Sequence, residues 1–214
     1  MHSQSKAWQV AIMGMLSAII LIFAFTPLGF IRLPFINATI LHIPVIIGSI
    51  LLGAKYGAAL GFLFGITSLI NNTIAPNPFI SFVFSPFIPV PTTGAGNPFA
   101  LVVCFLPRIL VGIFPYYTFK AMQKLLKDRA ELLSLTVSGI IGSMTNTLLV
   151  MHLIFFLFGD SFAYARALPA EAVYAAVLAI IAANGVPEAI VAAILTSAVC
   201  VPIMVIQKRS LKAR

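Results

Sequence analysis

Long runs of apolar residues, separated by short polar or charged segments, dominate the pattern along this chain. Residues 7–31 contain 25 positions without a charge, residues 33–54 contain 22, and residues 56–107 contain 52. Two later uncharged runs have 28 and 19 residues, between Glu131 and Asp160 and between Glu188 and Lys208. An α-helix needs about 20 apolar residues to cross the hydrocarbon core of a bilayer. Each run is therefore long enough for a transmembrane helix.

The pattern predicts an all-α fold: one integral membrane bundle of six transmembrane helices, in a single domain over residues 1–214. The predicted helices cover residues 7–25, 38–53, 56–70, 98–119, 132–158 and 185–206. A further apolar segment, residues 172–183, is too short to span at 12 residues, and Asn184-Gly185-Val186-Pro187 follows it. We expect this segment to be an interfacial or re-entrant helix on the outer side.

The composition supports the same class. Hydrophobic residues make up 61% of the chain and charged residues 8%, with a mean hydropathy of +1.09. Soluble domains carry about 25% charged residues, so a soluble enzyme, a disordered chain and a nucleic-acid-binding domain are excluded. Cys104 and Cys200 lie in apolar runs, which is typical of buried packing. The sequence has no metal-binding spacing, phosphate-binding glycine loop or catalytic motif, so we expect neither a cofactor nor enzymatic activity.

The net charge of +8 indicates topology rather than a nucleic-acid partner. With the N-terminus inside, 10 of the 13 Lys and Arg residues lie on the cytoplasmic side, as the positive-inside rule requires. These are Lys6, Lys55, Lys120, Lys124, Lys127, Arg129, Lys208, Arg209, Lys212 and Arg214. We therefore predict cytoplasmic N- and C-termini and a long extracellular loop between the third and fourth helices.

That loop, residues 71–97, has an unusual composition for a loop. It carries no charge, four phenylalanines and several prolines, which oppose helix formation. One interpretation is a lid over a cavity in the outer half of the bundle, suited to a small amphipathic ligand. The alternative is a loop that only packs on the bundle or lies in the membrane interface.

Several polar side chains lie within the predicted helices. An ionisable residue there costs about 2.5–3.5 kcal/mol and indicates function by default. Arg108 lies about 15 Å deep, at about 1.5 Å per residue, and its partner is either Glu188 or an anionic ligand. Asn146 lines a cavity or mediates helix packing, and His42 is a helix–helix hydrogen-bond partner or a ligand contact. Asn184 is the fifth such residue.

Small residues recur along the first predicted helix, with Ala7 and Ala11 followed by Gly14 and Ala18. Such spacing allows close approach of another helix. That helix belongs either to this bundle or to a partner subunit.

Six stretches, in their order and spacing, resemble a known family. They are residues 41–48 (LHIPVIIG), 52–57 (LGAKYG), 61–65 (GFLFG), 82–86 (FVFSP), 106–112 (LPRILVG) and 184–189 (NGVPEA). The pattern resembles the substrate-binding subunit (S component) of energy-coupling-factor (ECF) vitamin transporters, and most resembles the pantothenate-type branch. The branches for hydroxymethylpyrimidine and other vitamins are close rivals.

The resemblance implies a multi-pass protein of a bacterial cell membrane. Such subunits bind a water-soluble vitamin from outside, in a pocket that loops cover. They then dock on a transmembrane coupling (T) subunit with two ABC-type ATPase subunits, and these partners hydrolyse ATP. The resemblance favours partner docking for the face formed by Ala7, Ala11, Gly14 and Ala18.

For pantothenate, a monoanion, we expect Arg108 to bind the carboxylate, and Glu188 to orient Arg108 or accept a ligand hydroxyl. Asn71, Asn72, Asn146 and Asn184 would meet the hydroxyls and the amide, and His42 and Phe84 complete the predicted substrate-binding set. A neutral pyrimidine or a pyridoxine-like ring would instead stack on the phenylalanines of the loop, Phe79, Phe82, Phe84 or Phe87. A vitamin of the folate type is a further alternative ligand. A membrane scaffold without a ligand is the remaining alternative.

Overall fold

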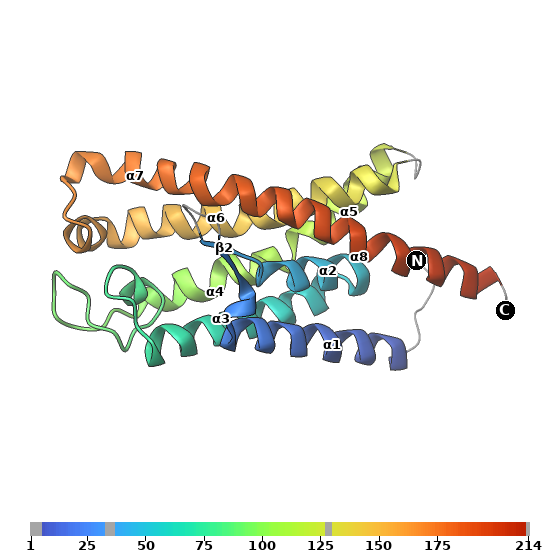
Figure 1. Ribbon diagram of the computed structural model, residues 1–214, viewed down its shortest axis with the longest axis horizontal. Helices are drawn as coiled ribbons and strands as arrows, with labels where there is room; N and C mark the ends of the chain where they lie inside the picture. Colours follow the sequence, from blue (N-terminus) through green and yellow to red (C-terminus); the bar gives the residue numbers. More distant parts are fainter. Residues whose placement is uncertain (1–5, 33–36, 127–129, 213–214) are drawn as a thin grey trace.

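The computed structural model describes residues 6–32, 37–126 and 130–212. Its helices lie side by side along the long axis of the molecule (Figure 1). They are α1 (Lys6–Phe25), α2 (His42–Leu52), α3 (Ala54–Ile74), α4 (Phe99–Val111), α5 (Phe114–Leu125), α6 (Glu131–Ala165), α7 (Val173–Ile180) and α8 (Val186–Lys212). The α3–α4 loop and the α6–α7 connection lie at one end, and α1 begins and α8 ends at the other (Figure 1).

Five segments among the described residues are long and apolar enough to cross a membrane: Lys6–Phe25, Ala54–Ile74, Phe99–Leu125, Glu131–Ala165 and Ala170–Gln207. The sixth, α2, has only 11 residues. The helical membrane bundle is therefore confirmed, with one helix much shorter than its predicted span, residues 38–53.

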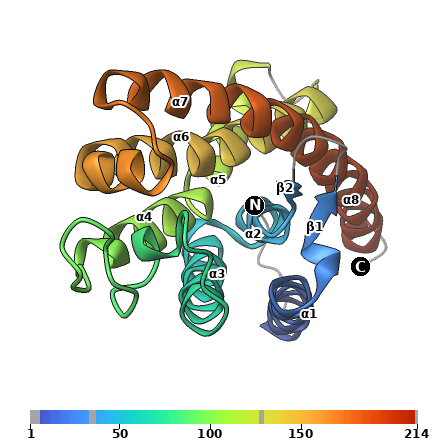
Figure 2. The ribbon, with the colours of Figure 1, turned by 60° about the vertical axis from the view of Figure 1, so that its left-hand side comes forward.

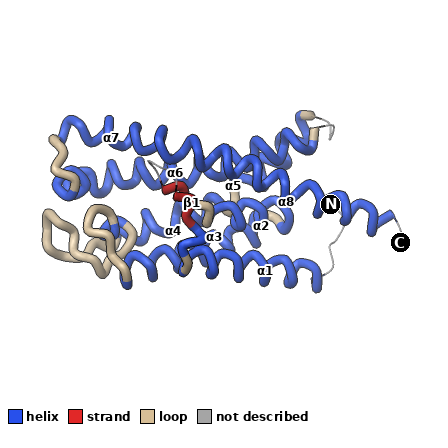
Figure 3. Tube along the Cα trace, viewed as in Figure 1, coloured by secondary structure: helices blue, strands red, loops and turns tan. Residues whose placement is uncertain are grey.

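The short helix follows two short strands, β1 (Phe30–Arg32) and β2 (Asn37–Thr39), which pair antiparallel. These strands lie about halfway along the bundle (Figure 3), so α2 occupies only the half nearer the chain ends. Pro44 explains the late start of α2. Proline has no N–H to donate and is favoured in the first turn of a helix, and α2 begins two residues before it.

Helix α2 lies at the centre of the bundle (Figure 2). All of its residues are buried, and it contacts α1, α3, α4, α5, α6 and α8. Around it, α3 and α4 approach until their backbones touch. A Cβ on Gly57 would collide with the carbonyl oxygen of Gly112, and a Cβ on Gly61 with that of Arg108. These two glycines set the position of α4, and hence of Arg108, relative to α3.

No break separates residues 172–183 from the last helix in the described chain, so the expectation of a separate re-entrant helix is wrong. A position in the membrane interface stays a prediction. The chain continues from η3 (Ala170–Ala172) through α7 and η4 (Ile181–Gly185) into α8, as one apolar segment. Pro187 does not break the helix, because η4 is a π-helical turn directly before it. A π turn widens the helix locally, and this geometry accommodates a proline that has no N–H to donate to the preceding turn.

Two clusters of buried side chains fill the interior. One joins α1, α2 and α3, with residues such as Ile20, Ile46 and Leu60. The other joins the α3–α4 loop, α4, α6 and α7, with residues such as Phe82 and Phe162. The loop includes η2 (Ser81–Val83).

Candidate functional site

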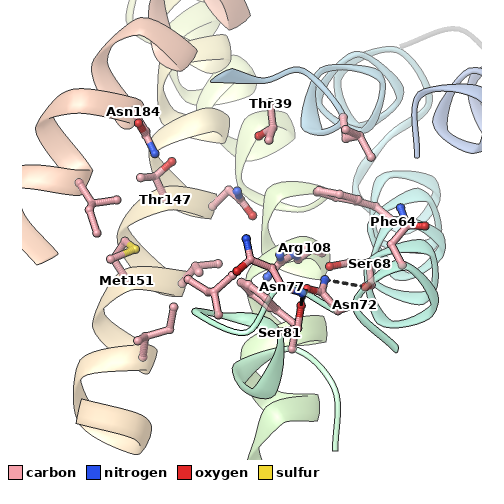
Figure 4. A pocket seen from close by; sticks show the side chains of 18 of the residues that line it. Thr39, Phe64, Ser68, Asn72, Asn77, Ser81, Arg108, Thr147, Met151 and Asn184 are labelled. Atoms are coloured by element: carbon pink, nitrogen blue, oxygen red, sulfur yellow. Dashed lines mark hydrogen bonds between the residues drawn. The ribbon is translucent and has the colours of Figure 1, made fainter. Parts of the chain in front are cut away.

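A cavity of about 620 Å³ lies where the two clusters meet, since its lining draws on both. That volume is within the range of about 300–1,000 Å³ typical of small-molecule sites. Figure 4 shows its side chains converging from the two sides of the bundle. The lining comes from β2, α3, the α3–α4 loop, α4, α6, the residue after α6, α7, η4 and α8.

Arg108 lies in the middle of this lining (Figure 4). Its side chain is 6% exposed. One terminal nitrogen donates to the Val103 carbonyl at 2.8 Å, and the guanidinium lies 4.8 Å from the centroid of the Phe84 ring. The buried Nε has no hydrogen-bond partner among the described residues. A buried cationic donor without a partner is unfavourable, so the cavity suits an anionic or strongly accepting group.

Glu188, in the first turn of α8, also lines the cavity and is likewise 6% exposed. One carboxylate oxygen accepts from the backbone N–H of Thr39 at 2.8 Å and from its hydroxyl at 3.0 Å. The other accepts from the Thr147 hydroxyl at 3.2 Å. Within the described residues Arg108 and Glu188 form no ion pair; each has its own partners, and both line the same cavity.

Comparison with known proteins now identifies the chain. The family model for the ECF transporter substrate-specific component matches residues 9–200. The chain is also 39% identical, over 198 residues, to the pantothenic acid transporter PanT of Lactococcus lactis subsp. cremoris. That alignment covers 92% of this chain and 93% of PanT. This chain belongs to the ECF substrate-specific components. It is therefore a multi-pass protein of the bacterial cell membrane and a transport subunit rather than an enzyme.

Seven of the eight residues predicted to bind substrate line the cavity of this S component: Asn71, Asn72, Phe84, Arg108, Asn146, Asn184 and Glu188. His42 does not. It lies in the first turn of α2, the fully buried helix, and neither ring nitrogen has a partner among the described residues. Its contact with substrate remains a prediction that the cavity lining does not support.

The asparagine side chains of the cavity differ in how many of their amide atoms already have hydrogen-bond partners in the protein. Asn71 and Asn72, predicted in the loop, lie in the last turns of α3. The Asn71 amide donates to the Ala24 carbonyl at 2.6 Å, and Asn72 is bonded at both amide atoms. The buried Oδ1 of Asn146, in contrast, has no partner within the described part of the chain. Asn146 and Asn184 both line the cavity, and we expect these two amides to meet the ligand.

Hydrogen bonds hold the α3–α4 loop over the cavity. The backbone N–H of Asn77 donates to the Ser81 hydroxyl at 2.8 Å, and that hydroxyl donates to the Asn72 side chain at 2.7 Å. Farther along, the hydroxyls of Thr92 and Ser161 lie 2.7 Å apart, which ties the loop to α6. Its apolar residues Phe82, Val83 and Val90 are buried. The loop is thus a packed cover, and Asn77, Ile80, Ser81 and Phe84 line the cavity beneath it.

The prediction missed several lining residues: Thr39, Ser68, Asn77, Ser81, Thr147 and Met151. Helical periodicity contains a signal for some of them. Phe64, Ser68 and Asn72 follow one another at intervals of four on α3, and Thr147 and Met151 are four residues apart on α6. Residues at such spacing share one face. Thr39 and Asn77 could not be found this way, because neither lies in a helix.

Proposed function

We propose that this S component captures pantothenate from outside the cell and delivers it inward when docked on its partner subunits. The observation that carries the proposal is the buried Arg108, which lines a roomy cavity and whose Nε has no hydrogen-bond partner in the described part of the chain. An arginine binds a carboxylate through parallel, charge-assisted hydrogen bonds, which are strongest where water is excluded. The relationship to PanT supports pantothenate as the source of that carboxylate.

The rest of the ligand would be met by the remaining polar groups. Pantothenate has two hydroxyls and a secondary amide besides its carboxylate. Asn146 and Asn184 offer both donors and acceptors to the amide. Glu188 accepts a ligand hydroxyl in addition to its bonds from Thr39 and Thr147, since an ionised carboxylate has about four acceptor positions.

The phenylalanines argue against a neutral aromatic ligand that stacks on the loop. Phe82 is 1% exposed in the core, while Phe79 and Phe87 are 54% and 72% exposed. Of these four only Phe84 lines the inner cavity, and the guanidinium of Arg108 already lies over its ring. A hydroxymethylpyrimidine or pyridoxine ring would have to displace that cation.

The proposed orientation places the chain ends in the cytoplasm and the α3–α4 loop outside. Lys6 starts α1, Lys55 lies in the first turn of α3, and Lys120 and Lys124 lie in α5, near the end where α8 finishes (Figure 1). The positive-inside rule assigns this end to the cytoplasm. The cavity then opens toward the external side.

We further propose that α1 carries the face that docks on the transmembrane coupling subunit, which works with two ABC-type ATPases. Ala7, Ala11, Gly14 and Ala18 are all exposed. Helix α1 is also the least buried of the long segments. In its most apolar stretch 17% of the residues are buried, against 33–44% in the other long segments. An exposed stripe of small residues permits close helix–helix contact in a membrane. Replacing Gly14 and Ala18 with leucine should weaken co-purification with the coupling subunit, and an equally stable complex would contradict this assignment.

The test of the ligand is calorimetry on the purified chain in detergent. We expect saturable binding of pantothenate with a stoichiometry near one. Hydroxymethylpyrimidine, pyridoxine and folate should bind more than about 100-fold more weakly, a gap of about 2.7 kcal/mol. Tight binding of a neutral ring without pantothenate binding would reassign the ligand. Silence with all four compounds would favour the scaffold alternative.

A further inference from the structure

A second cavity, of about 600 Å³, adjoins the substrate cavity on its outer side. It lies between the α3–α4 loop and α7, beside the connection that follows α6. Its lining is Asn77, Phe79, Ile80, Arg166, Leu168, Ala176, Ala179 and Ile180. Four of these residues, Asn77, Ile80, Arg166 and Ile180, also line the inner cavity. The two cavities therefore adjoin and share part of their lining.

Among the described residues that line this outer cavity, only Arg166 is charged. It is exposed, directly follows α6, and lies at the end of the molecule that we assign to the outside. Its guanidinium is 4.6 Å from the centroid of the Phe162 ring. Among the described residues no carboxylate forms an ion pair with Arg166, and the nearest acidic residues in the sequence, Asp160 and Glu171, do not line the cavity. Its charge is thus available to an incoming anion.

We propose that the outer cavity is the vestibule through which substrate reaches the inner cavity, and that Arg166 captures anionic substrates there. The carboxylate would first be drawn to Arg166. The carboxylate would then leave Arg166, pass Asn77, Ile80 and Ile180, and bind the buried Arg108. A cation at the mouth of a low-dielectric cavity raises the local concentration of an anion and so its association rate. This inference rests on the proposed function, because it assumes that the substrate is an anion.

The test separates association from dissociation. Kinetic calorimetry on the full chain would give both rate constants for pantothenate and for its neutral alcohol analogue, in which a hydroxymethyl group replaces the carboxylate. We expect Arg166→Gln to lower the association rate constant for pantothenate by about 3- to 10-fold. The dissociation rate constant, and both constants for the alcohol, should stay within about twofold. Arg166→Lys should retain most of the parent rate.

Salt provides a second readout. The difference between Arg166→Gln and the parent should disappear at about 1 M salt, where the Debye length is about 3 Å. Lys120→Gln is the matched control, since Lys120 also lies 4.6 Å from an aromatic centroid, that of Tyr116, but in α5. It should leave both rate constants unchanged.

A steric variant tests the vestibule independently of charge. Ala176 lines only the outer cavity, whereas its neighbour Ala175 lines neither. Ala176→Trp should slow association and dissociation together, by about tenfold or more, with the Kd within about twofold, because an obstacle in a path raises the barrier in both directions. Ala175→Trp is the control for an added indole on the same helix.

Several results would overturn the proposal. If Arg166→Gln accelerates dissociation with association unchanged, Arg166 is a contact in the final bound state. If it affects pantothenate and the alcohol equally, its role is structural. If Ala176→Trp leaves both rate constants at parent values, the substrate takes another route. A parent chain that binds no pantothenate would instead refute the proposed function, which distinguishes the two failures.

Discussion

Removing the charge of Arg108 should weaken binding of pantothenate far more than binding of its neutral alcohol analogue. In Arg108→Gln the side chain stays polar, but the buried cation is lost. The backbone of α4 is fixed by its contact with Gly61 of α3, so the site is not expected to rearrange around the change.

The magnitude follows from the burial of the site. Two unit charges about 4 Å apart at an effective dielectric constant of about 20 interact by about 4 kcal/mol. Truncating one member of a buried, hydrogen-bonded charge pair costs about 2–5 kcal/mol. We therefore expect a loss of about 2–4 kcal/mol for pantothenate, which raises the Kd about 30- to 800-fold. For the alcohol the loss should be about 0.5–1.5 kcal/mol, as for a neutral hydrogen bond.

Calorimetric titration of both ligands into the parent and into Arg108→Gln forms a double-mutant cycle that isolates the charge–charge contribution. Arg108→Lys keeps the charge but not the planar donor pair, and should fall between the parent and Arg108→Gln for pantothenate. Thermal unfolding without ligand would verify that each variant is folded. If Arg108→Gln binds pantothenate within about twofold of the parent, or loses equal free energy with both ligands, Arg108 does not bind the carboxylate.

Three further changes test the structure around the site. Glu188→Gln should lower the free energy of unfolding by about 1–3 kcal/mol, because an amide group cannot accept all the hydrogen bonds from Thr39 and Thr147; unfolding at the parent temperature would contradict this. Gly61→Ala should lower the free energy of unfolding by about 1–3 kcal/mol, because the added methyl group overpacks against the Arg108 carbonyl. Gly159→Ala is the control and should not lower it, because a methyl group there meets no atom within 4 Å. Ser81→Ala removes the hydroxyl that joins Asn77 to Asn72 and should increase hydrogen exchange in the loop and accelerate ligand dissociation; parent exchange rates would show that the loop is held elsewhere.

Much of this molecule could be predicted from the sequence because the bilayer imposes simple requirements. A helix must be about 20 residues long to span, so the charge-free runs locate most of the helices. Polar groups are costly in lipid and therefore indicate a cavity or a contact. That reasoning identified Arg108, Asn146, Asn184 and Glu188 as residues of interest, and all four line the same cavity.

The errors arise where local backbone geometry overrides these rules. The sequence predicts a helix end at Pro187, but a π turn lets the helical segment continue from Val173 to Lys212. Whether a helix ends at a proline or continues through it depends on the neighbouring helices, which a single sequence does not show. The choice between an Arg108–Glu188 pair and separate partners was also open, because Thr39, which bonds Glu188, lies in a strand that no periodicity predicts.

The short central helix explains why this bundle has a cavity at all. Helix α2 lies on the axis of the bundle, yet its 11 residues extend only about 16 Å, at about 1.5 Å per residue. It begins beside the cavity, where Thr39 and Leu41 form part of the lining. The outer half of the axis therefore has no helix to fill it, and the surrounding α3, α4, α6 and α8 face an open volume that the loop covers. Polar residues such as Arg108 and Glu188 are tolerated at this depth because they face that volume and not lipid. Two further turns at the start of α2 would occupy the same space, so the start of α2 at His42 leaves room for the binding site.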